Sequence, residues 1–389
     1  MKMKTYNVLW IDDKFKEMRD FQVLAENHSI LLEGYKSKEE AFDVLENGRK
    51  IFDAILLDGI FFEKKNQETG TENVVALGMA IQRINELKSS RIYPWFVLSG
   101  QDQFIKTEDS LLIANKKRSY DKTNPKCFVD LFNAIKEESD AMPETKIKHN
   151  YYKAFDLCTD DYIGEECASK LLFLLTGVED KTKNHNTEDK LNAIRKIIEN
   201  IFNKFYQIGI IPAEIARGNG SMNKSGDFLA GLNRQYKYNE HILHPVISHQ
   251  LISILDLTQD GSHLKGDLKL GVDDFINSQN TPYLFNSIIF QLLDIMIWCK
   301  NYFDNHQDST YNNKITELLE IDSTTYYDGL IEQDSSGNFH CGEYALAYLH
   351  ITNNNFKIGD RIRITESTEN TNIKTNSLYS KRAKRFIQL

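Results

Sequence analysis

The sequence has little of what marks extracellular, fibrous or zinc-stabilised proteins. Its 389 residues include only six prolines and five cysteines. An odd number of cysteines without regular spacing argues against a disulfide framework. There is also no CxxC pair or His/Cys cluster of the kind that binds zinc. We therefore expect reduced thiols, as in a cytoplasmic protein.

Long apolar runs and strong positive charge are absent as well. The longest apolar stretches, such as residues 171–175, are too short to cross a bilayer. The N-terminus leads directly into a predicted strand, so we expect no signal peptide, no membrane partner and a cytoplasmic location. The net charge of −9 argues against polyanion binding by the chain as a whole. A chain of this length can form two or three domains.

Carboxylates follow two apolar runs near the N-terminus. Asp12 and Asp13 follow residues 7–11, and Asp58 follows residues 54–57. An apolar run that ends in a carboxylate is typical of a buried parallel strand whose carboxyl end reaches the binding edge of a sheet. Three carboxylates at one edge would repel one another unless a hard cation lay between them. The pattern therefore predicts a Mg²⁺ site.

A hydroxyl and a lysine extend this series. Ser99 follows the apolar run 93–98, and Lys122 follows residues 119–121. An acidic pair, a single Asp, a hydroxyl and a Lys, in this order on successive strand ends, resemble the receiver domain of two-component response regulators. The resemblance covers roughly residues 4–140. It implies a flavodoxin-like α/β fold with a parallel five-stranded sheet.

The resemblance also implies a phosphoacceptor and its metal. Asp58 would accept a phosphoryl group from a histidine kinase or a small phosphodonor. Mg²⁺ would be held by Asp12, Asp13, Asp58 and the backbone carbonyl of Ile60. One departure from the family pattern lies after Asp58, where the polar stretch 63–71 lengthens the connection to the next strand. A Rossmann-like sheet with incidental acids at its edge is the alternative.

The same resemblance assigns roles at the end of the receiver-like region. Ser99 and Lys122 would stabilise the phosphoryl group, and Tyr120 would be the aromatic switch residue. The family's proline after the lysine is Thr123 here, and Tyr120 precedes Lys122 by two positions instead of three. Two nearby lysines, at positions 116 and 117, are therefore alternatives to Lys122.

Periodicity predicts alternating strands and helices up to residue 140, which is the first predicted domain. We expect strands at 5–11, 51–57 and 95–98, and helices at 37–47, 73–87 and 127–135. Residues 139–150 are polar, and we place a domain boundary there. The second predicted domain, 146–305, is a helical bundle with helices at 165–175, 189–207, 245–257 and 282–303.

The bundle has a weaker resemblance to HEPN-type bundles, including those of abortive-infection proteins. A helix at 193–199 is followed by a long loop and by residues 257–263. Members with ribonuclease activity have an Arg where this chain has Thr258, so we expect a scaffold or a homodimerisation bundle. His263 and Arg195 form a candidate second site for a defence-type ribonuclease. The alternative is that His263 caps or hydrogen-bonds a turn and that Arg195 forms a surface ion pair with Glu199.

The third predicted domain, 324–389, has the pattern of a small β-barrel of OB or SH3 type, after a polar linker at 304–323. We expect strands at 326–332, 338–345, 357–364 and 379–389. Residues 356–389 contain eight Lys or Arg against three Asp or Glu. Such a barrel can bind nucleic acid through aromatic and basic residues. The candidate contacts are Phe339, Tyr344, Lys381, Arg382, Lys384 and Arg385; the alternative is that the rings are core and the charges are solvated.

Taken together, these patterns favour a response regulator-like signalling protein in which Asp58 phosphorylation switches a helical and β-barrel output. The alternatives are a defence-type ribonuclease or nucleic-acid-binding effector under receiver-like control, and a pseudo-receiver that only mediates partner contact. The partner kinase, the output activity and the ligand of the barrel do not follow from the sequence.

Overall fold

The computed structural model describes most of the chain, and the statements below concern those residues. They are 4–48, 50–68, 74–89, 91–100, 118–180, 187–217, 221–258, 272–279, 281–319, 326–372, 375 and 378–389. The described residues separate into two compact units. Residues 234–240 and 316–389 form the second unit, and the remaining described residues form the first.

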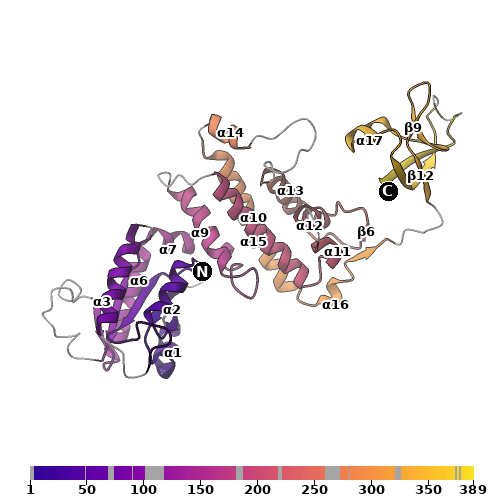
Figure 1. The fold of residues 1–389 in the computed structure, drawn as a ribbon. Helices are drawn as coiled ribbons and strands as arrows, with labels where there is room; N and C mark the ends of the chain where they lie inside the picture. The colour runs from indigo at the N-terminus through magenta and orange to yellow at the C-terminus, as the bar shows by residue number, and fades with distance from the viewer. Residues whose placement is uncertain are drawn as a thin grey trace. The chain divides into compact units, whose positions relative to one another are not determined.

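A parallel five-stranded sheet lies at the N-terminal end of the first unit (Figure 1). Its strands, in the order β2-β1-β3-β4-β5, are β1 (Tyr6–Ile11), β2 (Ile30–Tyr35), β3 (Ala54–Asp58), β4 (Trp95–Ser99) and β5 (Ser119–Asp121). This is the flavodoxin-like strand order, in which the order reverses next to β1. The predicted α/β fold class is confirmed.

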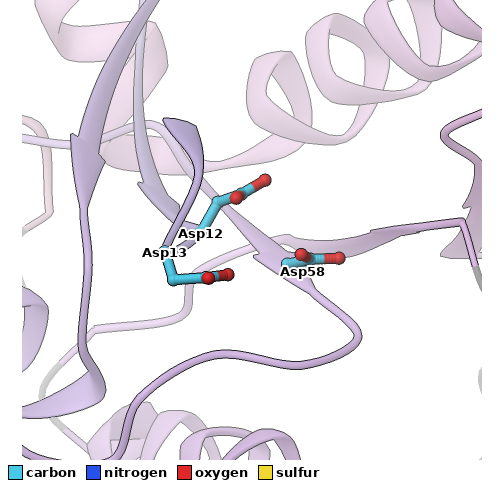
Figure 2. A group of neighbouring side chains, drawn as sticks. All are labelled: Asp12, Asp13 and Asp58. Carbon is cyan, nitrogen blue, oxygen red and sulfur yellow. The ribbon is translucent and has the colours of Figure 1, made fainter. Parts of the chain in front are cut away.

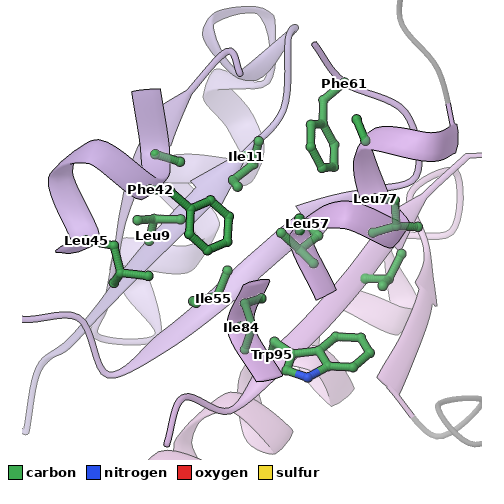
Figure 3. Packing of buried hydrophobic residues seen from close by; sticks show 14 of the residues in the cluster. Leu9, Ile11, Phe42, Leu45, Ile55, Leu57, Phe61, Leu77, Ile84 and Trp95 are labelled. Carbon is green, nitrogen blue, oxygen red and sulfur yellow. The ribbon is translucent and has the colours of Figure 1, made fainter. Parts of the chain in front are cut away.

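Helices cover both faces of this sheet. They are η1 (Phe15–Glu17), α1 (Arg19–Asn27), α2 (Lys38–Glu46), α3 (Val74–Glu86), η2 (Leu87–Ser89) and α6 (Lys126–Ala141). Side chains alternate along each strand, so one face packs against α2 and α3 and the other against α1 and α6. Figure 3 shows the first of these cores, in which Leu9, Ile11, Ile55 and Leu57 meet Phe42.

Local sequence accounts for the start of α2. The Ser37 hydroxyl accepts a hydrogen bond from the backbone N–H of Glu40 at 3.2 Å. This N-cap satisfies one of the backbone donors that a helix leaves unpaired in its first turn. The predicted helix at 37–47 is therefore present, one residue shorter at each end.

The remainder of the first unit is helical, as predicted. Its helices are α7 (Pro143–Asn150), α8 (Tyr152–Phe155), α9 (Glu166–Glu179), α10 (Thr187–Gln207), α11 (Ala213–Ala216), α12 (Ser221–Leu229), α13 (Pro245–Thr258), α14 (Val272–Gln279), α15 (Tyr283–Asn305) and α16 (Ser309–Asn312). The polar segment 139–150 is mostly helical, because α6 continues to Ala141 and α7 begins at Pro143. Some of its polar residues are exposed, but Ser139 and Thr145 are buried and hydrogen-bond to Asp53 beside the sheet.

One helix corrects the sequence-based view of apolar length. α15 has 23 residues and is apolar enough that, by length and composition alone, it could cross a membrane. Of its most apolar 18-residue stretch, 44% is buried inside the protein. Its buried side chains include Ile288, Leu292 and Met296, which recur at the spacing of one helix face. It is thus a core helix of the bundle in this structure.

The second unit contains a six-stranded, nearly closed barrel in the order β8-β12-β13-β11-β10-β9. Its elements are β8 (Tyr327–Leu330), β9 (Glu332–Gln333), β10 (Phe339–Cys341), β11 (Tyr344–Ala345), α17 (Tyr348–Asn353), β12 (Arg361–Glu369) and β13 (Lys381–Gln388). Two short strands, β6 (Tyr236–Tyr238) and β7 (Thr316–Leu318), pair with each other. The predicted linker at 304–323 therefore contains α16 and β7.

Candidate functional site

Three carboxylates meet at the carboxyl edge of the five-stranded sheet. Asp12 and Asp13 follow β1, and Asp58 ends β3. Because Ile11 pairs with Leu57 in parallel register, the residues that follow them emerge side by side. One oxygen from each carboxylate lies within 4.8 Å of the others, and Figure 2 shows the three side chains grouped there. Asp13 and Asp58 are half-buried and Asp12 is fully buried.

Backbone N–H groups fix one oxygen of the Asp12 carboxylate and one oxygen of the Asp58 carboxylate. Asp12 Oδ1 accepts a hydrogen bond from the N–H of Lys14 at 2.8 Å. Asp58 Oδ1 accepts one from the N–H of Gly59 at 2.7 Å. These two hydrogen bonds hold the side chains of Asp12 and Asp58 in place.

Lys122 joins these two carboxylates. Its Nζ lies 2.7 Å from Asp12 Oδ2 and 3.1 Å from Asp58 Oδ2. Lys122 follows β5, and its backbone N–H donates to the carbonyl of Ser99 at 3.0 Å. The pairing of β4 with β5 thus brings a residue 64 positions away from Asp58 into contact with it. Lys116 and Lys117, the sequence alternatives, lie outside the described residues.

The charges at this edge do not balance. Burial, and then the charge of Asp12, raise the pKa of Asp58 to about 6, against the opposing effects of Lys122 and the Gly59 N–H. Burial would lower the pKa of Lys122, but the two carboxylates outweigh it and the pKa is raised. Counted formally, Asp12, Asp13 and Asp58 carry three negative charges and Lys122 carries one positive charge.

This donor set fits a divalent cation. Carboxylate oxygens are the ligands that hard cations such as Mg²⁺ prefer, and Mg²⁺ takes few of them from protein. A cation held among Asp12, Asp13 and Asp58 would offset the repulsion between their neighbouring carboxylates. Ile60 lies two residues after Asp58 and is partly buried, and a role for its carbonyl as a further ligand stays a prediction.

The remaining residues predicted for this site lie close by in the sheet. Ser99 is the last residue of β4 and is 2% exposed. Tyr120 lies in β5, partly buried, with its ring centroid 6.4 Å from that of Phe96. Burial, together with the acids Glu138 and Asp130, raises the pKa of the Tyr120 hydroxyl. Their roles as phosphoryl ligand and switch residue stay predictions.

The predicted second site is only partly described. Arg195 lies on α10 and is partly buried. Its expected partner, Glu199, forms an ion pair with Lys196 at 3.2 Å. His263 lies outside the described residues, so the pairing of His263 with Arg195 stays untested.

The candidate nucleic-acid contacts are spread around the barrel, with the basic ones on β13. Tyr344 is buried, and Phe339 packs against the barrel core. The exposed ring nearby is that of Tyr348, which is 65% exposed. Lys381 forms an ion pair with Glu343 at 2.8 Å.

The other three basic side chains on β13 differ in exposure. Arg382 and Lys384 are exposed, and Arg385 is half-buried. Arg385 donates to the carbonyl of Arg234 at 3.1 Å. A nucleic-acid role for this strand stays a prediction.

A buried polar cluster at the opposite edge of the sheet was missed by the sequence analysis. Asp53, just before β3, forms an ion pair with Lys148 of α7. Asp53 also accepts hydrogen bonds from the Asn7 N–H at 2.7 Å and the Thr145 hydroxyl at 3.0 Å. The only local signal is a single acid inside the apolar run 51–57.

Comparison with known proteins does not place the chain in a family. No family model and no curated protein matches it, and no match supports the predicted relation to HEPN-type bundles. Among solved structures, full-length FixJ from B. japonicum has 12% identity and a TM-score of 0.26, covering 59% of this chain and 100% of FixJ. A fusion protein with a trimeric coiled coil of yeast Spc42 has 18% identity and a TM-score of 0.26, covering 40% of this chain and 92% of that one. Neither likeness, at such TM-scores, bears on the function of this chain.

Proposed function

We propose that residues 1–140 are a receiver domain in which Asp58 accepts a phosphoryl group in the presence of Mg²⁺. The observation that carries this proposal is the cluster of three carboxylates, Asp12, Asp13 and Asp58, in which the Lys122 ammonium contacts two of them. A merely structural acid at a sheet edge would need neither two further acids nor a shared lysine.

The residues present suit phosphoryl transfer, which depends on positioning and charge neutralisation. The Gly59 N–H fixes Asp58 Oδ1, so Oδ2 is the oxygen that attacks phosphorus. An acyl phosphate bond then forms, and the bond from phosphorus to the donor's nitrogen or oxygen breaks with its electron pair. Lys122 neutralises charge on the phosphoryl oxygens, and the Ser99 hydroxyl donates to one of them. Bound Mg²⁺ supplies further neutralisation of the same charge.

The added charge of about −1.5 to −2 gives the modification a structural effect. It draws Lys122 away from its present bonds to Asp12 and Asp58, and it favours the conformation in which Ser99 and Tyr120 turn towards the phosphoryl group. We assign the output to the helical segment 146–305 and the barrel 324–389. The donor would be a histidine kinase or a small phosphodonor, and the output would be a change in partner contact or homodimerisation.

Incubation of the full chain with Mg²⁺ and acetyl phosphate, followed by intact-mass measurement, tests the proposal. The wild type should gain one phosphoryl group, and Asp58→Asn should gain none. Asp43→Asn is the matched control, because Asp43 is an exposed acid on α2, away from the carboxylate group. Chelation of Mg²⁺ with EDTA should prevent the gain.

Two results would overturn the proposal. One is a wild type that gains no mass under these conditions. The other is equal gain by the wild type and Asp58→Asn, which would place the phosphoryl group on another residue.

A further inference from the structure

A cavity of about 660 Å³ lies in the first unit, at the amino edge of the five-stranded sheet. The sheet supplies residues 31–33 of β2 and residues 50–52, which precede β3. The other wall comes from α7, α8 and the start of α9. This edge is opposite to the one that carries Asp58, so the cavity is separate from the carboxylate group.

The interior of the cavity is largely apolar. Ile51 and Phe52 are buried in the wall that the sheet provides, and Phe155 and Cys158 face them from the helical side. Leu31 also lines the cavity and is 48% exposed, which is unusual for a leucine on a strand beside a core. Cavities of this size with mostly apolar walls hold small organic molecules.

Most of the charged groups around the cavity already have partners. Lys50 lies 2.9 Å from both Glu33 and Glu165, and Lys4 lies 2.9 Å from Asp140. Because these charges are already paired, the cavity does not strongly attract a highly charged ligand.

The same holds for the groups nearest to α7 and α8. Lys148 is paired with Asp53, and His149 Nε2 lies 3.2 Å from the carbonyl of Thr5. Asp156, which also lines the cavity, interacts with other groups of the protein as well.

Lys146 differs from these groups. It lies in the middle of α7, lines the cavity and is exposed, which places it at the mouth. Among the residues that the structure describes, no ion-pair partner is found for it. The cavity thus has an apolar interior and, among the lysines that the structure describes around it, one at its entrance whose ammonium group is not in an ion pair.

We propose that this cavity binds a small organic acid with an apolar, ring-sized body and a single anionic group, which meets Lys146. The apolar body displaces water from the walls formed by Phe52 and Phe155, and this burial supplies most of the affinity. The anionic group remains near solvent, where Lys146 contributes a modest electrostatic attraction. Occupancy would join the sheet to α7 and α8 more tightly, because ligand that binds only the folded state stabilises it.

Anilinonaphthalene sulfonate, an aromatic body with one sulfonate, is a suitable probe. Titration of the full chain should give a saturable rise in its fluorescence with one probe per chain, and a higher melting temperature. Lys146→Glu should weaken binding at least about fivefold, since it removes an exposed charge contact worth up to about that factor and puts a like charge in its place. Lys153→Glu is the matched control: it makes the same change of charge at an exposed position on α8 that does not line the cavity. It should bind like the wild type.

Filling the cavity provides a second variant. Ala168, on α9, lines the cavity and is not fully buried, so Ala168→Trp should occupy part of the space and abolish binding. Ala141→Trp, at an exposed position at the end of α6, should bind normally. Circular dichroism melts verify that each variant is folded. Absence of one-to-one binding by the wild type, or equal weakening by Lys146→Glu and Lys153→Glu, overturns the proposal. Undiminished binding by folded Ala168→Trp overturns it as well.

Discussion

Replacement of Asp53 by Asn should destabilise the first unit by about 3–5 kcal/mol, because it leaves Lys148 buried without a counter-charge. Asp53 is 1% exposed, and the side chain of Lys148 is 12% exposed. Asn has the size of Asp. Its amide oxygen can still accept from the Asn7 N–H, and its NH2 group can donate to the Thr145 hydroxyl oxygen in place of the bond that Asp53 accepts, so the change mainly removes the charge. Burial lowers the pKa of Lys148 despite the attraction of Asp53, because water solvates this ammonium group poorly.

The pair has a natural double-mutant cycle. Lys148→Met alone leaves Asp53 charged, but with two hydrogen-bond donors still in place, and should cost about 2–3 kcal/mol. The double variant Asp53→Asn, Lys148→Met removes both charges and retains one hydrogen bond each with Asn7 and Thr145, the latter donated by the Asn amide, so it should lie within about 1 kcal/mol of the wild type. A coupling energy of several kcal/mol is thus expected between two residues 95 positions apart.

Urea unfolding of the full chain measures these differences. Tryptophan fluorescence reports on both parts of the first unit, since Trp10 and Trp95 lie in the sheet and Trp298 lies on α15. The exposed pair Lys4 and Asp140 gives the control, with side chains 52% and 37% exposed. Asp140→Asn should cost at most about 1 kcal/mol. The reasoning is refuted if Asp53→Asn shifts the unfolding midpoint no more than Asp140→Asn does, or if the double variant is as unstable as Asp53→Asn.

Three further outcomes are expected. Lys122→Met should slow phosphorylation by acetyl phosphate about 100-fold, because a preorganised charge near a transferring group is worth a few kcal/mol; a mass time course that matches the wild type would contradict this. Asp13→Ala should weaken Mg²⁺ binding at least about tenfold in calorimetric titration, since it removes a proposed ligand, and unchanged affinity would remove Asp13 from the site. In the barrel, hydrogen bonds from Asn338, Tyr379 and Ser336 lower the pKa of Asp334 to about 2, against a usual value of 3.8. The folded state binds that proton less readily than the unfolded state, so this contribution to stability is present above pH 3.8 and is lost as the pH falls towards 2. Thermal melts of the wild type and Asp334→Asn should therefore converge as the pH falls through this range.

The elements that follow from the sequence are those with strong local signals. β1 and β3 are buried on both faces, so their apolar runs are continuous and were predicted to within three residues. β2 was missed because it is an edge strand, and only Ile30 of its six residues is buried. Its apolar pattern is correspondingly weak, with Glu33 and Gly34 in its middle.

Long-range contacts explain what local patterns could not decide. The sequence pattern favours Lys122 and leaves Lys116 and Lys117 as alternatives. The register of β5 on β4, with Asp121 opposite Ser99, is what carries Lys122 to the carboxylates. In the same way, Asp53 gives no local sign that its partner is Lys148, because that contact depends on how α7 packs against the sheet.

The two polar clusters lie at opposite ends of the same strand. β3 begins directly after Asp53, which anchors α7, and it ends at Asp58, the proposed phosphoacceptor. A five-residue strand is about 16 Å long, and β3 is hydrogen-bonded to β1 and β4 over most of that length. A displacement of β3 that accompanies phosphorylation would therefore reach the Asp53–Lys148 pair and the cavity beside it without passing through the helices that cover the sheet. Because coupling between sites is reciprocal, a ligand in that cavity would in turn alter the equilibrium at Asp58.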